Sequence, residues 1–98
     1  MSFRMTVEDV FAIRNRGTVA TGRIESGVLR VGDTVSVNGG PEVRVDAIER
    51  FRKSLQEATV GENVGVLLKG IEKDQLGRGD ILSSTGEAPA AQSATFIL

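Results

Sequence analysis

The sequence predicts an all-β fold, a small closed antiparallel barrel of about six or more short strands. Segments rich in Val, Ile, Thr and Phe alternate every several residues with turns that contain Gly, Asn, Ser or Asp. The pair Asn38-Gly39, a strong signal for a hairpin turn, separates two runs in which polar and apolar residues alternate. At 98 residues the chain has room for one hydrophobic core.

The first two strands are expected to form a hairpin. Residues 7–13 and 18–24 are β-prone, and the polar corner Arg14-Asn15-Arg16-Gly17 joins them. A Glu-Ser-Gly turn leads to a short segment at 28–31. Glycines recur here every five residues, but the residues between them differ, so turns and a bulge explain the glycines better than an internal repeat.

The second half of the barrel is expected to contain four further extended segments and one helical turn. Residues 34–37 and 43–48 alternate with period two, so each strand should bury one face. Residues 63–68 form the most apolar run and are predicted to lie at the centre of the core. Residues 71–76 are expected to form a short helical turn, after which 81–82 return to extended structure.

The domain organisation predicted is a barrel over residues 1–83, followed by a small-residue linker and an apolar strand over 84–98. The apolar segment 94–98 offers an edge for self-association. The N-terminus lacks a secretory signal pattern, and no apolar run approaches the roughly 20 residues of a membrane helix. A cytoplasmic protein is therefore expected.

The composition argues against an enzyme. The chain contains no cysteine and no histidine, which removes thiolate sites and the commonest general base. The phosphate-binding pattern G-x-x-x-x-G-K-[ST] is also missing from the sequence, so we expect no catalytic, metal or cofactor site. A formal net charge of -1 lacks the basic excess of a protein that binds nucleic acid through phosphates alone. Nucleic-acid contacts must then be local or shared with another domain.

Three short charged motifs have competing interpretations. Residues 49–53 combine Phe51 with three basic residues, which suits stacking on a base, but they also suit a strand with Phe51 facing the core and its charges solvated. Glu8 and Asp9 are adjacent, and neighbouring strand residues point to opposite faces, so they should not share a proton. The tripeptide at 78–80, Arg-Gly-Asp, is expected to be a turn.

Several long motifs resemble the second domain of bacterial elongation factor Tu, a member of the translation-factor GTPase superfamily. The family patterns V-E-D-V-F-x-I, G-R-G-T-V-x-T-G-R-I-E, M-F-R-K and G-x-N-V-G-V-L-L-R-G resemble residues 7–13, 16–25, 51–53 and 61–70. The resemblance covers nearly the whole chain and implies a translation-factor domain 2 barrel, of the elongation factor/reductase-isomerase-like type. It also implies a non-catalytic module that helps to bind the aminoacylated 3′ end of tRNA and contacts the small ribosomal subunit.

The resemblance further implies the partners and the site residues. The GTPase and third domains of a parent factor would complete the tRNA site, and residues 94–98 resemble the opening strand of that third domain. Binding of the tRNA 3′ end is implied for Ile13, Val19, Glu49, Leu67, Arg52 and Asn63, with Glu49 accepting a hydrogen bond from the terminal ribose. The vicinity of the aminoacyl group is implied for Glu8, Asp9, Phe11 and Phe51. Contact with ribosomal RNA is implied for Asn15, Arg16, Gly17 and Arg23.

Two functions remain open at this point. One is the translation-factor module just described, which the presence of Glu49 and Asn63 favours. The other is a free-standing barrel used for protein interaction or regulation without tRNA binding. Asn15, at a position that is glycine in the family pattern, and the near-neutral net charge favour this second function. Arg50 in place of the usual methionine and a short loop at 38–41 are further departures from the family.

Overall fold

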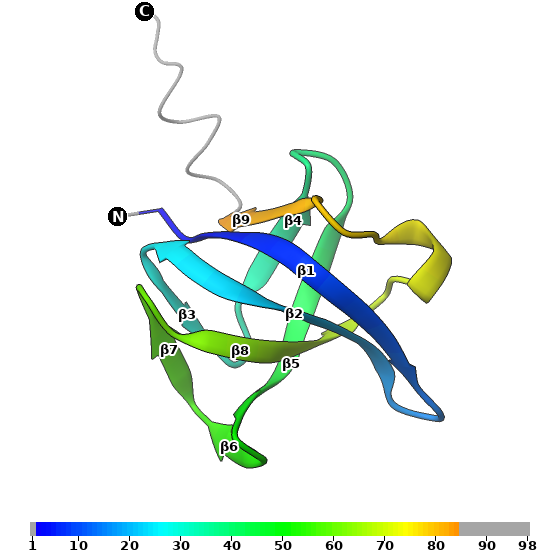
Figure 1. Cartoon of the computed structure of the whole chain (residues 1–98). Helices are drawn as coiled ribbons and strands as arrows, with labels where there is room; N and C mark the ends of the chain where they lie inside the picture. The colour runs from blue at the N-terminus through cyan, green and yellow to red at the C-terminus, as the bar shows by residue number, and fades with distance from the viewer. Residues whose placement is uncertain (1, 85–98) are drawn as a thin grey trace, which may run out of the picture.

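The computed structural model describes residues 2–84, which form a closed antiparallel barrel of six strands (Figure 1). Around the barrel the order is β4-β9-β1-β2-β8-β5, and pairing of β4 with β5 closes the ring. Strand β6 extends the sheet beyond β5, while β3 and β7 form a separate two-stranded ribbon. The predicted fold class is therefore confirmed. The elements are β1 (Arg4–Ile13), β2 (Gly17–Ser26), β3 (Val28–Arg30), β4 (Thr34–Val37), β5 (Glu42–Arg50), β6 (Lys53–Leu55), β7 (Glu57–Thr59), β8 (Asn63–Lys69), the 3-10 helix η1 (Lys73–Gln75) and β9 (Ile81–Ser84).

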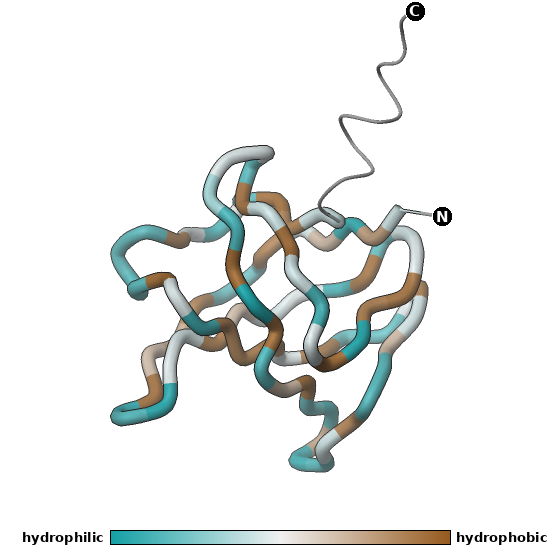
Figure 2. Tube along the Cα trace, turned by 180° about the vertical axis from the view of Figure 1, so that it is seen from behind, coloured by the Kyte–Doolittle hydropathy of each residue, from teal (hydrophilic) through white to brown (hydrophobic). Residues whose placement is uncertain are grey.

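The barrel interior is filled by apolar side chains that alternate along the strands. Strand β8 lies between β2 and β5, and its residues Val64, Val66 and Leu68 belong to the core cluster. Its predicted central place is thus confirmed. In Figure 2 hydrophobic residues run along the strands, and the outermost turns are mostly hydrophilic. The largest fully buried side chains are Phe3, Met5, Ile24, Leu29, Ile48, Leu68, Leu82, Val7, Val35, Val45 and Val66.

Three β-bulges bend the strands of the described barrel. The pairing register between β1 and β2 shifts twice, and the register between β5 and β8 shifts once. The extra residues at these shifts are Glu8, Glu25 and Asp46, all of them exposed. A bulge increases the local twist and leaves one residue unpaired, which helps a short sheet to curl into a barrel. Each extra residue is a carboxylate that remains in contact with water.

The β4–β5 connection is the hairpin turn that the Asn-Gly pair predicts. Asn38 and Gly39 have φ angles of 53° and 74°, and the Gly40 N–H donates to the Val37 carbonyl at 2.8 Å. Positive φ at both central residues is the hallmark of a type I′ turn, whose twist matches that of the flanking strands. The Asn38 side chain also reaches β9, where its Oδ1 accepts the Ile81 N–H at 2.9 Å. The turn therefore helps to close the barrel.

The Arg-Gly-Asp tripeptide is a turn, as predicted, and the structure shows that this turn packs against β1. The Gly79 N–H donates to the Val7 carbonyl at 2.8 Å, and the Val7 N–H donates to the Asp80 carbonyl at 2.8 Å. The Arg78 guanidinium donates to the backbone carbonyl of Glu8 at 2.9 Å. Since Glu8 is the extra residue of the β1 bulge, Arg78 supplies a partner to a carbonyl at the point where the ladder is interrupted.

Strand β9 closes the described part of the chain and pairs with both β1 and β4. It runs through Ser84, so Ser84 belongs to the last strand and not to the linker that the composition suggested. The Ser84 Oγ accepts the Phe3 N–H at 2.8 Å, which ties this strand to the start of β1. The rest of the predicted linker and the apolar segment 94–98 lie outside the described residues. Within 2–84 there is no helix with the length and apolar character needed to cross a membrane.

The carboxyl group of Glu25 links stability to pH. A hydrogen bond from the Thr6 hydroxyl, and then one from the Arg4 guanidinium at 3.0 Å, hold the pKa of Glu25 below its ordinary value of 4.5. A carboxyl group whose pKa is lower in the folded state stabilises that state above the unfolded pKa. The stabilisation is lost as the pH falls through the folded pKa.

We therefore expect Glu25→Gln to lower the melting temperature at neutral pH. Because the ion pair between Arg4 and Glu25 is exposed, the decrease in melting temperature should be small. The decrease should shrink as the pH drops below 4.5, where the unfolded state takes up the proton first, and it should vanish once the pH is below the lowered pKa of the folded state. Thermal unfolding of both proteins across this pH range measures the difference. An equal difference in melting temperature at neutral and acidic pH would contradict the link between the lowered pKa of Glu25 and stability.

Candidate functional site

A narrow apolar slot lies on the outer face of β2, β8 and β5. Val19 pairs with Leu67, and Leu67 pairs with Ala47, so cross-strand register sets three side chains in one row. Leu67 is only 5% exposed, yet it stands outside the core cluster, because it points to the face opposite its core neighbours. The slot is lined by Ile13, Arg16, Val19, Ala47, Glu49, Gly65 and Leu67.

The slot holds four of the residues that the family resemblance implied for the tRNA end. Ile13, Val19 and Leu67 supply apolar surface, and Glu49 supplies a carboxylate at the rim. The volume of the slot is about 20 Å³, enough for one water molecule. A ligand as large as a nucleobase would therefore pack across the mouth of the slot without being enclosed.

Glu49 is exposed near the end of β5, where its strand neighbours are Gly65 of β8 and Ser54 of β6. Within the described part of the chain its carboxylate has no ion pair and no hydrogen bond. Both oxygens can therefore accept hydrogen bonds from a ligand. Gly65 contributes no side chain to the slot, and a Cβ at this position would lie 3.4 Å from Cγ1 of Val19, another lining residue.

A second, wider groove continues from the slot and shares Glu49 and Gly65 with it. Its volume is about 230 Å³. It brings Glu8, Phe51 and Asn63, three more of the implied residues, beside Glu49. The complete lining is Glu8, Thr21, Gly22, Glu49, Arg50, Phe51, Asn63, Val64 and Gly65.

The turn between β5 and β6 projects from the end of the barrel (Figure 1). Phe51 and Arg52 both have left-handed backbones, with φ angles of 51° and 65°. The Phe51 side chain is 82% exposed, so the interpretation of residues 49–53 as a strand with an inward Phe51 is wrong. The chain reverses at these two residues, which turns the ring away from the core.

The β1–β2 corner forms a second projecting turn. The Arg16 N–H donates to the Ile13 carbonyl at 3.0 Å, and Asn15 has a φ of 64°. Asparagine tolerates this left-handed conformation better than most residues, which explains why it can replace glycine here. At Gly17 a Cβ would lie 2.7 Å from the Leu68 carbonyl oxygen, so this position requires glycine.

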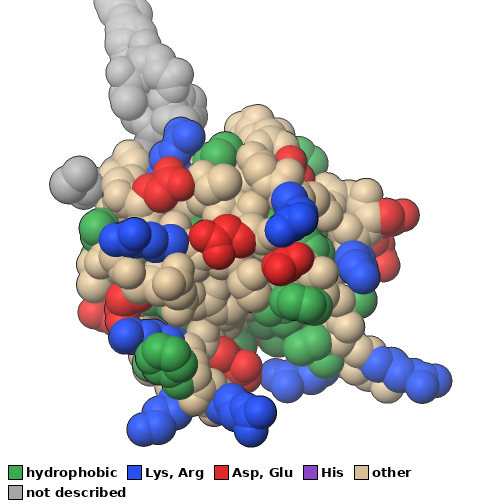
Figure 3. Space-filling view, viewed as in Figure 1, with side chains coloured by type: hydrophobic (Ala, Val, Ile, Leu, Met, Phe, Trp, Pro, Cys, Tyr) green, Lys and Arg blue, Asp and Glu red, His purple; other side chains and the backbone are tan. Residues whose placement is uncertain are grey.

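Basic side chains gather over both projecting turns, and apolar and acidic side chains lie between them (Figure 3). The residues concerned are Arg14 and Arg16 at the β1–β2 corner, and Arg50, Arg52 and Lys53 at the β5–β6 turn. The positive charge is therefore local, as a chain of near-neutral net charge requires for contact with phosphate.

Several implied residues lie apart from the slot and the groove. Asp9, Phe11 and Arg52 line neither of them. Glu8 and Asp9 are both exposed. They were expected on opposite faces because side chains alternate along a strand, but the bulge between Val7 and Asp9 interrupts that alternation.

Arg23 is separated from the β1–β2 corner with which the resemblance grouped it. It pairs with Asn63 and lies about 20 Å along β2 from Gly17. The structure therefore does not bring the four implied ribosomal contacts into one cluster. Ala47 and Gly65, which line the slot, were not singled out from the sequence, since only the cross-strand register reveals their place.

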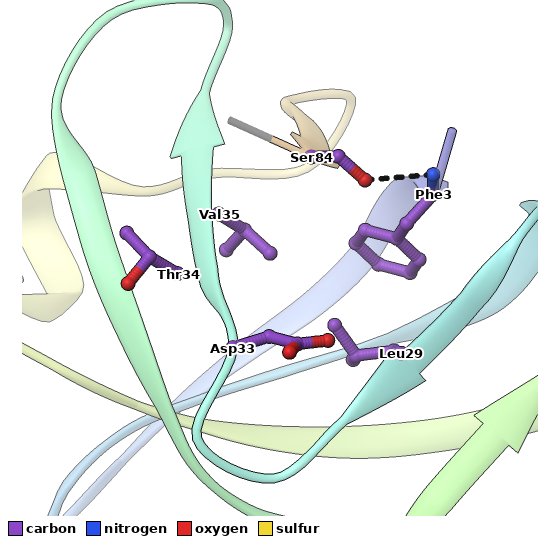
Figure 4. A pocket seen from close by; sticks show the side chains of 6 residues that line it. All are labelled: Phe3, Leu29, Asp33, Thr34, Val35 and Ser84. Atoms are coloured by element: carbon purple, nitrogen blue, oxygen red, sulfur yellow. Dashed lines mark hydrogen bonds between the residues drawn. The ribbon is translucent and has the colours of Figure 1, made fainter. Parts of the chain in front are cut away.

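Another hollow, of about 280 Å³, lies where β9 meets β4 and the start of the chain (Figure 4). Of its six lining residues only Asp33 is charged, and its carboxylate accepts the Arg30 N–H at 2.8 Å. Its Ser84 hydroxyl accepts the Phe3 N–H. These polar groups support the fold, and none of the implied site residues lies here. Among residues 2–84 no group of three or more carboxylate, thiol or imidazole side chains could hold a metal ion.

Residues 17–83 match the family described as Elongation factor Tu domain 2. Among solved structures, the chain is similar to translation elongation factor SelB from Methanococcus maripaludis in its apo form, with 36% sequence identity and a TM-score of 0.81. The match covers 87% of this chain and 19% of the SelB chain, so this chain spans about a fifth of that factor's length. These similarities support the family and do not single out bacterial elongation factor Tu among its members.

Proposed function

Because this chain belongs to the elongation factor Tu domain 2 family, we propose that it is the non-catalytic barrel module of a cytoplasmic translation factor. In this proposal it binds the aminoacylated 3′ end of tRNA and contacts RNA of the small ribosomal subunit. The observation that carries the proposal is the slot in which Ile13, Val19 and Leu67 meet the carboxylate of Glu49, which has no partner among residues 2–84.

The chemistry of the slot suits the terminal nucleoside of an RNA. Apolar side chains can pack against the face of a base, and a carboxylate, which only accepts hydrogen bonds, can bind a ribose hydroxyl. Glu49 would then distinguish an RNA end from one that lacks its 2′-hydroxyl. The wider groove beyond Glu49 would receive the aminoacyl group beside Glu8, Phe51 and Asn63.

The projecting turns would contact the RNA backbone on either side of the slot. Arg16 lines the slot itself and can reach a phosphate near the terminal nucleoside. Arg52 and Lys53 would do the same from the β5–β6 turn. We assign ribosomal RNA contact to the corner at Asn15, Arg16 and Gly17, and a separate contact to Arg23.

The barrel on its own should bind tRNA only weakly. The slot is too small to enclose a base. In this proposal the surface is one wall of a composite site, which the GTPase and third domains of a parent factor would complete, as the family resemblance implies. A single wall must offset the full loss of translational and rotational freedom with few contacts. We therefore expect a Kd weaker than about 10 μM for the chain alone.

Glu49→Gln tests the proposal directly. Glutamine preserves the shape of the side chain but removes the charge that strengthens a hydrogen bond from the ribose hydroxyl. We expect binding of aminoacyl-tRNA to weaken by about 1–2 kcal/mol. Titration of the labelled tRNA into each protein, followed by fluorescence anisotropy, gives the two affinities. A tRNA with a terminal 2′-deoxyribose on an aminoacyl-3′-amide linkage should bind both proteins with similar, weaker affinity.

Glu42→Gln is the matched control, since Glu42 is an exposed carboxylate at the far end of the same strand. It makes the same change in net charge and should leave tRNA affinity unchanged. Identical isotherms for wild type and Glu49→Gln would remove the assigned role of Glu49. Complete absence of tRNA binding would favour the alternative, a barrel retained for protein interaction or regulation.

A further inference from the structure

The β5–β6 turn adopts a conformation that its own residues disfavour. Phe51 and Arg52 occupy the left-handed region in succession, although neither is the glycine or asparagine that such turns prefer. The Phe51 ring is 82% exposed and belongs to no part of the core cluster. Burial of the ring therefore does not compensate for the backbone strain, and other contacts must hold the turn.

Arg50, immediately before the turn, makes two such contacts. Its Nη1 lies 2.8 Å from the Glu62 carboxylate, and its guanidinium carbon lies 5.0 Å from the centre of the Phe51 ring. A guanidinium over an aromatic face is attracted by the ring electrons. One side chain thus connects the tip of this hairpin to the turn between β7 and β8.

Glu62 is a fixed anchor for this bridge. Its Oε1 accepts the Thr59 N–H at 2.7 Å, and its backbone carbonyl accepts the Ile24 N–H at 3.0 Å. Its side chain is 26% exposed, against 41% for Arg50. Because the carboxylate and the backbone of Glu62 are both held by hydrogen bonds, its ion pair with Arg50 restrains the β5–β6 hairpin.

We propose that Arg50 is a positioning residue that holds the Phe51–Arg52 turn in its left-handed conformation and orients the exposed ring beside the groove. Arg50 and Phe51 both line the groove that contains Glu8, Glu49 and Asn63. The consequence for tRNA rests on the proposed function, whereas the conformation of the turn is a property of this chain alone. The two can therefore be tested separately.

Arg50→Met removes the guanidinium while keeping a long unbranched side chain. Glu62→Gln removes the charge from the other end of the bridge and keeps an oxygen for the Thr59 N–H. Arg14→Met is the control, because Arg14 is exposed in the other projecting turn and loses the same charge. The full chain is used for every variant. The readouts are amide hydrogen exchange in β6 and the fluorine resonance of Phe51 in protein labelled with 4-fluorophenylalanine, assigned with Phe51→Leu.

Both bridge variants should speed exchange of the β6 amides by about three- to tenfold, because both lose a partly exposed ion pair and Arg50→Met also loses the cation–aromatic contact. The Phe51 resonance should move towards that of an unstructured peptide in both. Arg14→Met should change neither readout. If Arg50→Met matches Arg14→Met in exchange rate and resonance position, the inference is overturned.

Titration of aminoacyl-tRNA into the same proteins separates this inference from the proposed function. A roughly threefold weaker affinity in Glu62→Gln, which breaks the ion pair but removes no basic side chain, would support both the positioning role and the tRNA site. A loosened turn with unchanged tRNA affinity would support the positioning role and count against a part for Phe51 in tRNA binding.

Discussion

Replacing Gly22 with alanine is expected to lower the free energy of unfolding by about 3 kcal/mol. A Cβ at this position would overlap the backbone carbonyl oxygen of Thr6 and would lie 3.3 Å from Met5 Cγ. The close approach arises where the register between β1 and β2 shifts between Val7 and Asp9. The nearest atom belongs to the backbone of a paired strand, so the clash is relieved only if the β1–β2 ladder moves.

Urea unfolding followed by circular dichroism measures this loss as a lower midpoint with an unchanged slope. Gly77→Ala is the matched control, because a Cβ there meets nothing within 4 Å and its backbone is not left-handed. We expect the control to change stability by less than about 0.5 kcal/mol. Equal midpoints for the two variants would show that the two strands separate easily at Gly22.

The features that the sequence predicts best are those set by neighbouring residues. The Asn38-Gly39 turn follows from the tolerance of both residues for positive φ, and β8 follows from a continuous apolar run flanked by polar residues. The hairpin of β1 and β2 was also predicted, including the turn at the Arg14–Gly17 corner. Each of these is determined within a short stretch of chain, where a single sequence carries enough information.

The bulges and the strained turn could not be located from local pattern alone. A bulge was expected among the glycines of β2, but the extra residues are carboxylates, which any exposed strand position would accept. The left-handed backbone at Phe51 and Arg52 contradicts their intrinsic preferences. We assign its stability to the ion pair between Arg50 and Glu62, which lie twelve residues apart and whose pairing no local propensity encodes.

The candidate site likewise combines features that local sequence predicts with features that depend on distant residues. Period-two alternation explains why Val19 and Leu67 face outward, but their meeting with Glu49 across three strands depends on the register. The proximity of Ile13, Val19, Glu49 and Leu67 was expected from the family resemblance and not from spacing. Neither source indicated how shallow the slot is, because its volume depends on how the side chains that line it pack together.

The two adjacent leucines of β8 should separate the stability of the barrel from the function of its outer face. Leu68 is fully buried in the core between Thr18 of β2 and Val45 of β5. Leu68→Ala should lower the free energy of unfolding by about 2–5 kcal/mol, because it removes buried methyl groups and leaves a cavity that the closed barrel cannot fill. Chemical unfolding measures the loss, and a change below about 1 kcal/mol would contradict the assigned core position.

Leu67→Ala is the matched variant, since it makes the same chemical change one residue away on the opposite face. Leu67 already borders an open slot, so its truncation enlarges an existing hollow and creates no enclosed cavity. We expect a loss of only about 1–2 kcal/mol in stability, from the transfer of apolar surface alone. If the slot receives the terminal base, Leu67→Ala should weaken tRNA binding, whereas Leu68→Ala, measured well below its melting temperature, should bind like wild type. If Leu67→Ala lowered stability more than Leu68→Ala, the outer face of β8 would support the barrel. If Leu68→Ala weakened tRNA binding more than Leu67→Ala, the outer face of β8 would not form the binding surface.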